Sequence, residues 1–173
     1  MIHSDYIRTN RIIAFVILIL SFIVYYKTMA PTVSYWDCGE FIAVSYTLGV
    51  PHPPGSPLFL LLGRIASLLP ISEDIAFRVN VLSPLASAFA VFFLYLSIVQ
   101  VVNHWRGKLE SSTDALVVFG AGIVGSLTFA FTDSHWFNAV EAEVYAFSTF
   151  FTAIVVWLIL LWSEKADEKG HER

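Results

Sequence analysis

Charge is scarce in this chain. Only 14% of the 173 residues are charged, whereas ordinary soluble domains carry about 25%. Apolar residues make up 57% of the sequence, and the mean hydropathy is +0.69. A chain with so few charges cannot cover a globule of this size with polar surface. The composition therefore excludes an ordinary soluble domain and predicts an integral membrane protein.

Basic residues and cysteine are scarcer still. Ten Lys and Arg stand against fourteen Asp and Glu, which leaves a net charge of -4 and no basic surface for nucleic acid. The single cysteine, Cys38, excludes an intramolecular disulfide and a cysteine-only zinc site. Phosphate-binding Walker loops and zinc-protease motifs are also missing from the sequence.

Long apolar runs are what the chain does contain. A helix needs about 20 apolar residues to cross a bilayer. Runs of this kind predict an all-α membrane protein with about four transmembrane helices, over residues 12–29, 79–102, 115–132 and 145–162. Pro84 should kink the second span near its start, because proline lacks the amide hydrogen that the helix needs.

The first run allows a second interpretation. Arg8 and Arg11 precede it, and a small-residue stretch at 28–30 resembles a cleavage site, so it could be a signal peptide. A spanning helix is favoured, because Lys27 can extend its charged end to the interface and Tyr25 and Tyr26 suit an interface anchor.

Positive residues predict the orientation, since they favour the cytoplasmic side of a membrane. Residues 1–11 are then a cytoplasmic N-terminus, residues 163–173 a charged cytoplasmic tail, and loops 30–78 and 133–144 lie outside. In a bacterium this places the chain in the cytoplasmic membrane with its acidic loops in the periplasm. The cytoplasmic residues in this arrangement are Arg8, Arg11, Arg106, Lys108, Lys165, Lys169 and Arg173, and the external ones are Lys27, Arg64 and Arg78.

The long external loop should carry two short juxtamembrane helices. The first follows Asp37 and stops before Gly49 and Pro51. The second covers 58–69, with Ser56 as its N-cap and Pro57 at its first position. Residues 72–74 repeat this pattern, with Ser72 as the cap of the helix that becomes the second span.

Seven acids fall in the external loops, and a carboxylate held at the bilayer face can act as a base or as a metal ligand. Asp37 and Glu40 would share one helix face, but the same spacing also fits a capping box. Glu141 or Glu143 could complete a divalent-cation site with Asp37. The seven are Asp37, Glu40, Glu73, Asp74, Asp133, Glu141 and Glu143.

Three further residues in the first loop are candidates for contact with a phosphate. His52 sits in the rigid proline-rich segment 51–57, although a lone histidine is more often structural or solvent-exposed. Arg64 interrupts an apolar helix and Arg78 lies at the mouth of the second span, where a charge is costly and often functional. Snorkelling towards lipid headgroups is the alternative for both arginines.

Residues 120–125 (GAGIVG) match the residue pattern of a dinucleotide-binding fingerprint but not its structural context. No strand precedes them, and they lie inside an apolar run. Small residues in such a place pack helices against one another, so we expect a packing role.

An ordered set of short segments resembles the N-terminal part of one membrane-protein family. The segments are 31–33 (PTV), 36–41 (WDCGEF), 52–57 (HPPGSP), 78–80 (RVN) with Ser83, and 141–145 (EAEVY). The family consists of bacterial multi-spanning proteins classed as a domain of unknown function. It is related to a vertebrate transmembrane protein O-mannosyltransferase and is similar to the C-type glycosyltransferases.

The resemblance implies a C-type glycosyltransferase-like N-terminal module that takes a sugar from a polyprenyl-phosphate donor. Asp37 is then the first candidate for the catalytic base and Glu40 the second. The acceptor would be a hydroxyl on a protein or glycan, and transfer would invert the anomeric centre. The phosphate could be contacted by His52, Arg64 or Arg78, with Tyr145 also placed at the substrate, or by Mg or Mn held by Asp37, Glu141 and Glu143; no other cofactor is expected.

Family members are several times longer than this chain. We therefore expect a truncated reading frame, a fragment or half of a split gene, with little activity in isolation. The alternatives are a non-catalytic membrane protein that binds lipid or assembles a partner, and a transporter fragment.

Overall fold

The computed structural model describes residues 2–107 and 111–170, and every regular element within them is a helix. Four helices are long and apolar enough to cross a membrane: Asp5–Thr28, Ile75–Arg106, Ser112–Ala130 and Val144–Ala166. The predicted all-α class with four spans is confirmed. The elements are α1 (Ile2–Thr28), α2 (Cys38–Thr47), α3 (Pro57–Leu68), α4 (Ile75–Asn80), α5 (Leu82–Arg106), α6 (Ser112–Ala130), α7 (Asp133–Ala139) and α8 (Val144–Gly170).

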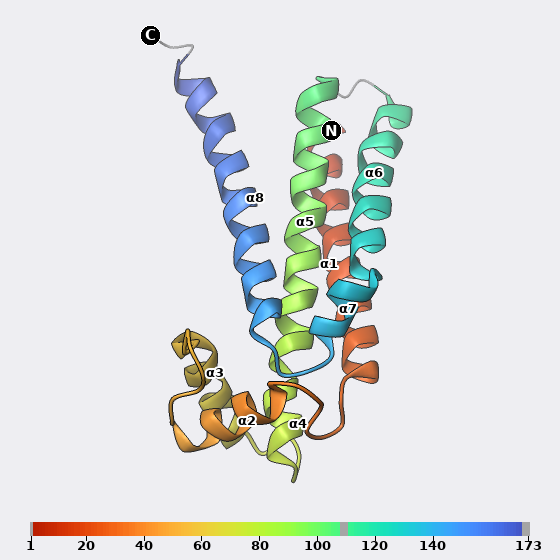
Figure 1. The fold of residues 1–173 in the computed structure, drawn as a ribbon. Helices are drawn as coiled ribbons and strands as arrows, with labels where there is room; N and C mark the ends of the chain where they lie inside the picture. Colours follow the sequence, from red (N-terminus) through yellow and green to blue (C-terminus); the bar gives the residue numbers. More distant parts are fainter. Residues whose placement is uncertain (1, 108–110, 171–173) are drawn as a thin grey trace.

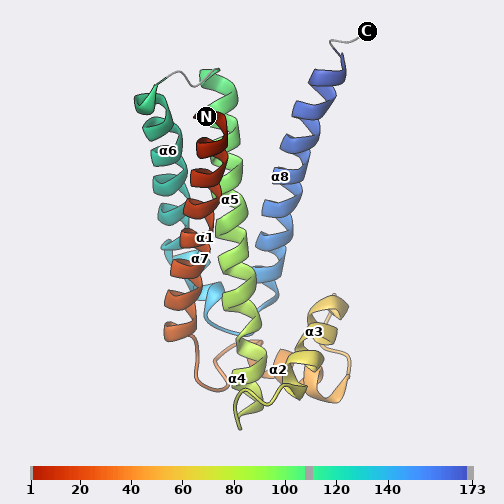
Figure 2. The same cartoon turned by 180° about the vertical axis from the view of Figure 1, so that it is seen from behind.

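The long helices run side by side, and the short ones gather at one end of them (Figures 1 and 2). The first turns of α1, the last turns of α5 and α8 and the first turns of α6 lie at the opposite end. The two acidic loops therefore share one end of the bundle, as four spans require. Lys108 and Arg173, which contributed to the predicted orientation, lie outside the described residues.

Helix α5 is the centre of the bundle, because α1, α6 and α8 all pack against it. In the most apolar stretch of the α4–α5 span 44% of the residues are buried, compared with 6% for α8. Buried alanines at 86, 88 and 90 have small side chains, so the backbones of neighbouring helices can approach α5 closely. Helix α8 meets α5 at the acidic end and diverges from it towards the termini (Figure 1).

The second span is broken close to its predicted kink. Helix α4 ends at Asn80, Val81 interrupts the helix, and α5 begins at Leu82. Pro84 has no amide hydrogen to donate to the carbonyl of Asn80, four residues earlier. The break therefore lies one turn before the proline that causes it.

The predicted short helices of the first loop are present as α2 and α3. Ser56 is the N-cap position of α3 and Pro57 follows it, as predicted, but the Ser56 side chain makes no capping hydrogen bond. At the next helix the prediction was wrong by two residues. Asp74, not Ser72, is the N-cap of α4, and its carboxylate accepts a hydrogen bond from the amide of Ala76.

Helix α7 lies within the segment predicted to be a loop. It has seven residues, and its inner face is held by burial of His135 and Ala139 against the bundle. The indole nitrogen of Trp136 donates a hydrogen bond to Thr28 Oγ1 at 3.1 Å. A helix of seven residues that depends on tertiary packing has too short a sequence pattern to be predicted.

The glycine-rich segment of α6 has the predicted packing role. A methyl group at Gly122 would lie 2.7 Å from Cγ2 of Val99 and 2.8 Å from a ring carbon of Tyr95, both on α5. At Gly120 such a group would meet nothing within 4 Å. Only the glycines that face α5 are therefore required by the contact.

We predict that Gly122→Ala destabilises the bundle and that Gly120→Ala does not. An extra methyl group forced into a packed contact costs about 1–3 kcal/mol. Thermal unfolding of the two variants in the same detergent measures the difference. Equal melting temperatures for Gly122→Ala and Gly120→Ala would contradict a close α5–α6 contact at Gly122.

Candidate functional site

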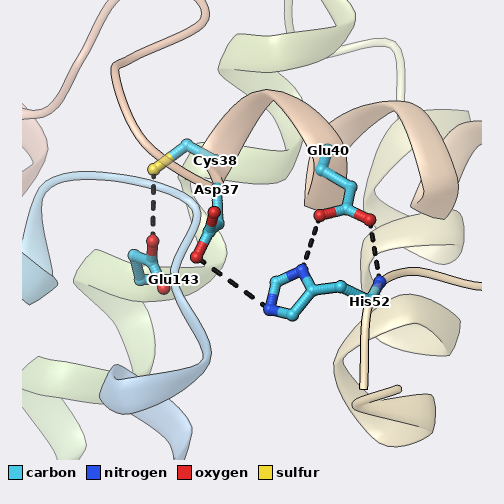
Figure 3. A network of polar contacts seen from close by, with 5 residues as sticks. All are labelled: Asp37, Cys38, Glu40, His52 and Glu143. Atoms are coloured by element: carbon cyan, nitrogen blue, oxygen red, sulfur yellow. Dashed lines mark hydrogen bonds and ion pairs between the residues drawn. The ribbon is translucent and has the colours of Figure 1, made fainter. Parts of the chain in front are cut away.

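The candidate site is built on the first turn of α2. Asp37 is the residue that precedes this helix, and Glu40 lies within its first turn. Two other segments reach the same place: the proline-rich loop after α2 and the short segment between α7 and α8 (Figure 3). The site therefore combines residues that are up to about a hundred positions apart.

Asp37 and Glu40 do not form the capping box that their spacing allowed. The backbone of Asp37 has φ -78° and ψ -8°, and its side chain makes no capping hydrogen bond. A capping side chain normally requires an extended backbone at this position. A true capping box occurs elsewhere, at Ser111 and Asp114 before α6, where the backbone of Ser111 is extended. The carboxylates of Asp37 and Glu40 are thus free for other contacts.

Glu40 uses both of its oxygens to hold His52. Its Oε1 accepts the backbone amide of His52 at 2.8 Å, and its Oε2 lies 2.6 Å from Nδ1 of the ring. This pairing lowers the pKa of the Glu40 carboxyl and raises the pKa of the His52 imidazole. Glu40 therefore fixes the orientation of the imidazole and favours its charged form.

Asp37 faces the other nitrogen of the same ring. Its Oδ2 lies 4.0 Å from Nε2 of His52, and 61% of its side chain is exposed (Figure 3). Within the described residues no hydrogen bond holds the Asp37 carboxylate. An accessible carboxylate beside an oriented imidazole can accept a proton from a bound hydroxyl.

A second group of ionisable side chains is buried behind Asp37. Cys38 Sγ donates to Oε1 of Glu143 at 3.6 Å, and Ser34 Oγ donates to Oε2 of Glu141 at 2.5 Å. Glu141 is 4% exposed and Glu143 is 7% exposed. Burial raises the pKa of the Glu143 carboxyl; burial, together with both glutamates, raises the pKa of the Cys38 thiol.

The structure groups the predicted cation ligands differently from the sequence-based proposal. Asp37 clusters with Glu40 and His52, whereas Glu141 and Glu143 cluster with Cys38. In each group the ligand atoms lie within 4.8 Å of one another, which is close enough to share a cation. The negative charge of Asp37 contributes to the raised pKa of Glu143, so the two groups are electrostatically connected.

The two arginines do not join either group. Arg64, on α3, donates to the backbone carbonyl of Tyr46 at 2.6 Å and lies over its ring, 5.4 Å from the centroid. Arg78, on α4, donates to the carbonyls of Ser72 and Ser67 at 2.6 and 2.8 Å. In this structure both guanidinium groups stabilise the helical layer of the first loop.

Tyr145 lies in the first turn of α8 with a largely exposed ring. It follows Glu143 by two residues, which places it at the same end of the bundle as the two groups of acids. No described side-chain contact links it to Asp37 or His52.

Sequence reasoning gave no role to several residues that hold the site together. Asn80 is fully buried, and its amide donates at 2.9 Å to the carbonyls of Ala30 and Thr32 in the first loop. Ser83 Oγ accepts the backbone amide of Glu143 at 3.4 Å. Two signals were available: both residues belong to the segments that carry the family resemblance, and both are small polar residues at the start of an apolar span, where such groups need partners.

Comparison with known proteins identifies related sequences over most of the chain. The family model described as "Protein O-mannosyl-transferase TMEM260 N-terminal domain" matches residues 37–173. Protein O-mannosyl-transferase tmem260 of Dictyostelium discoideum is 31% identical over 156 residues, which are 88% of this chain and 17% of that protein. Protein O-mannosyl-transferase TMEM260 of Mus musculus is 28% identical over 137 residues, 79% of this chain and 18% of that protein. The chain spans less than a fifth of the length of these two relatives, and no solved structure matches it.

We predict that Glu40→Gln lowers the pKa of His52 towards the ordinary value of 6.5, because it removes the charge that stabilises the imidazolium. The raised His52 pKa contributes stability below pH 6.5 that is lost as the pH rises through the folded-state value. The lowered Glu40 pKa contributes stability above pH 4.5 that is lost as the pH falls through its own folded-state value. The pair is therefore most favourable between these two ordinary values.

An NMR titration of the His52 ring protons measures this shift directly. Asp133→Asn is the matched control, because Asp133 is an exposed acid on α7 that makes no contact with His52. A His52 pKa that is the same in Glu40→Gln and the parent chain would show that the pairing does not exist in solution.

We also predict that Cys38 reacts slowly with iodoacetamide at pH 7.5. The thiolate is the reactive form, and both burial and the neighbouring glutamates raise the pKa of this thiol. Because Cys38 is the only cysteine, mass spectrometry of the intact chain measures its alkylation without ambiguity. Glu143→Gln should speed the reaction, whereas Glu73→Gln should not; fast alkylation of the folded parent chain would contradict a buried thiol.

Proposed function

The chain belongs to the family of the protein O-mannosyl-transferase TMEM260 N-terminal domain, and on that premise we propose that it forms the N-terminal membrane module of a glycosyltransferase. The donor is a sugar, mannose in the first instance, linked to a polyprenyl phosphate. The acceptor is a hydroxyl group on a protein. The acidic end of the bundle faces the external side of the membrane, where both substrates meet.

The observation that carries this proposal is the free carboxylate of Asp37. It is exposed, makes no capping contact and lies next to an imidazole with a fixed orientation. A structural acid would be expected to use its oxygens in the fold, as Asp74 and Asp114 do at their helices. An acid without such a role at the shared end of two loops is suited to contact a substrate.

Asp37 is a better base than Glu40 in this arrangement. Both Glu40 oxygens already accept hydrogen bonds from His52, and the pKa of Glu40 is lowered by that contact. A lower pKa weakens a general base, and occupied oxygens cannot receive a proton without breaking the pair. Glu40 is therefore assigned to position His52.

The proposed step is a single displacement. The acceptor hydroxyl oxygen attacks the anomeric carbon while Asp37 takes its proton. The bond between that carbon and the phosphate oxygen breaks, the lipid phosphate leaves with the electron pair, and the configuration inverts. Charged His52 lies 4.0 Å from Asp37 and can donate a hydrogen bond to the departing phosphate.

A divalent cation, Mg or Mn, fits this chemistry as a carrier of positive charge for the phosphate. The group of Asp37, Glu40 and His52 would hold such a cation only through the neutral imidazole, because a charged imidazole has no free lone pair, so the cation would replace charged His52 at the phosphate. Glu141 has a buried oxygen, Oε1, without a described hydrogen-bond partner, so the inner group also has capacity for a ligand. Titration of the chain with Mn, followed by the paramagnetic broadening of nearby resonances, identifies which group binds.

We predict that Asp37→Asn lowers sugar transfer by about 100-fold or more while the fold is retained, because it removes the general base. Loss of a mere helix cap would cost about 1 kcal/mol of stability and leave turnover similar. The assay measures transfer from a polyprenyl-phosphate-linked mannose to a hydroxyl-containing peptide in membranes that contain the whole protein. Circular dichroism of each purified variant checks the fold.

Two variants act as controls for this assay. Asp133→Asn removes an exposed acid from the same end of the molecule and should keep the parent rate. Glu40→Gln should lower the rate less than Asp37→Asn does, because it acts through His52. Parent-like turnover in Asp37→Asn would exclude Asp37 as the base and favour a non-catalytic, lipid-binding role for this module.

A further inference from the structure

A groove of about 810 Å³ lies on the side of the bundle between α1, α5 and α8. It lies where α8 diverges from α5, at the end of the bundle where α5 ends and thus far from the acidic site (Figures 1 and 2). The proposed function uses no residue of this groove.

The polar and charged side chains of the groove lie towards one end of it, where they alternate with Tyr6, Ile7, Val99 and Leu161, and the lining further in is apolar. Its outer part is lined by Asn10, Arg11, Gln100, Asn103 and Glu164. These residues lie near the first turns of α1, the last turns of α5 and the far part of α8. Three helices therefore contribute five polar or charged side chains to the same groove.

Aromatic and aliphatic side chains line the part that leads towards the middle of the membrane. They are Phe15 on α1, Phe92, Phe93 and Leu96 on α5, and Trp157 on α8. Gln100 and Phe92 are eight residues apart on one helix, which corresponds to about 12 Å along its axis. A ligand that fills the groove must accordingly be polar at one end and apolar along the rest.

The polar end has hydrogen-bonding groups without partners. Asn10 Oδ1, Gln100 Nε2 and Asn103 Oδ1 are buried and make no hydrogen bond with any residue that the structure describes. Buried amides in a native protein are nearly always paired, and unpaired ones indicate a missing partner. A rotation about the last side-chain torsion can turn either polar atom of each amide towards the groove.

The charges at this end are of opposite sign. Arg11 presents a guanidinium, which binds phosphate through two parallel hydrogen bonds, and Glu164 presents a carboxylate, which accepts from an ammonium group. We propose that the groove binds a zwitterionic aminophospholipid, with its phosphate at Arg11, its primary ammonium at Glu164 and an acyl chain along Phe15, Phe92 and Phe93.

A lipid fits this groove better than another helix does. The unpartnered amides and both charges lie towards one end of the groove, whereas a packed helix would need complementary groups along its whole length. An anionic lipid without an ammonium group would be repelled by Glu164. A lipid with a quaternary ammonium headgroup would bind less tightly, because that group cannot donate a hydrogen bond to the carboxylate.

Native mass spectrometry of the detergent-purified chain tests the proposal. The probes are dioleoyl-phosphatidylethanolamine, dioleoyl-phosphatidylcholine and dioleoyl-phosphatidylglycerol, each titrated separately. We expect phosphatidylethanolamine to bind about tenfold more tightly than the other two, which is the effect of about one charge-assisted hydrogen bond. Equal binding of the three lipids, or a preference for phosphatidylglycerol, would overturn the headgroup assignment and with it the proposal.

Two variants separate the contributions of the two charges. Arg11→Gln should weaken binding of all three phospholipids by about tenfold. Glu164→Gln should abolish the preference for phosphatidylethanolamine over phosphatidylcholine and leave phosphatidylcholine binding unchanged. Because the second readout is a ratio of two lipids on one variant, a loss of folded protein does not affect it.

Arg8→Gln and Asp5→Asn are the matched controls. Both residues lie on the same end of α1 but do not line this groove, so both variants should behave like the parent chain. A parent-like lipid preference in Glu164→Gln would overturn the proposal. A chain that binds none of the three lipids and forms a dimer would assign the groove to a second copy and would also overturn it.

Discussion

The junction between α4 and α5 holds the two acidic loops together. On one side of the break at Val81, the buried amide of Asn80 binds two carbonyls at the start of the first loop. On the other side, Ser83 accepts the backbone amide of Glu143 in the second loop. The loops also bind each other directly, since the amide of Ala30 donates to the carbonyl of Val140 at 2.8 Å. These contacts bring Asp37 of the first loop and Glu143 of the second loop to the same place.

The junction brings buried and exposed carboxylates close together. Glu141 and Glu143 are enclosed next to Cys38, and burial raises the pKa of the Glu143 carboxyl, which favours its neutral form. Asp37 and Glu40 lie on the exposed side of the same helix start, where Glu40 is kept charged by His52. One small region therefore contains acids that differ in their tendency to hold a proton.

The sequence was sufficient for the spans and for α2 and α3, because these elements depend on local signals. Long uncharged runs mark the spans, and the glycine and prolines around residues 49–57 mark the ends of the short helices. The break at Val81 follows from Pro84, although the predicted kink was one turn too late. Helix α7 could not be predicted, since its seven residues are held by packing of His135 and Ala139 rather than by a local pattern.

The pairings among the candidate site residues could not be predicted from the sequence. Asp37 and Glu40 could equally have been a capping box on spacing alone, and the backbone angles of Asp37 decide against it. Glu40 meets His52 only because the proline-rich loop turns back over α2. Cys38 meets Glu143 across 105 positions of the chain. Contacts of this kind depend on the tertiary fold, and the spacing of residues in one sequence does not predict them.

The charge balance of the site bears on what else the reaction needs. Four carboxylates and one imidazole gather near the start of α2, while Arg64 and Arg78 are bound to backbone carbonyls elsewhere in the layer. A cluster of carboxylates suits proton removal from an acceptor but not the departure of a phosphate, because an ionised carboxylate repels the phosphate. His52 alone offsets only part of that repulsion. The proposed transfer therefore requires further positive charge at the leaving group, from a bound divalent cation or from regions that the much longer relatives contain beyond the part matched here.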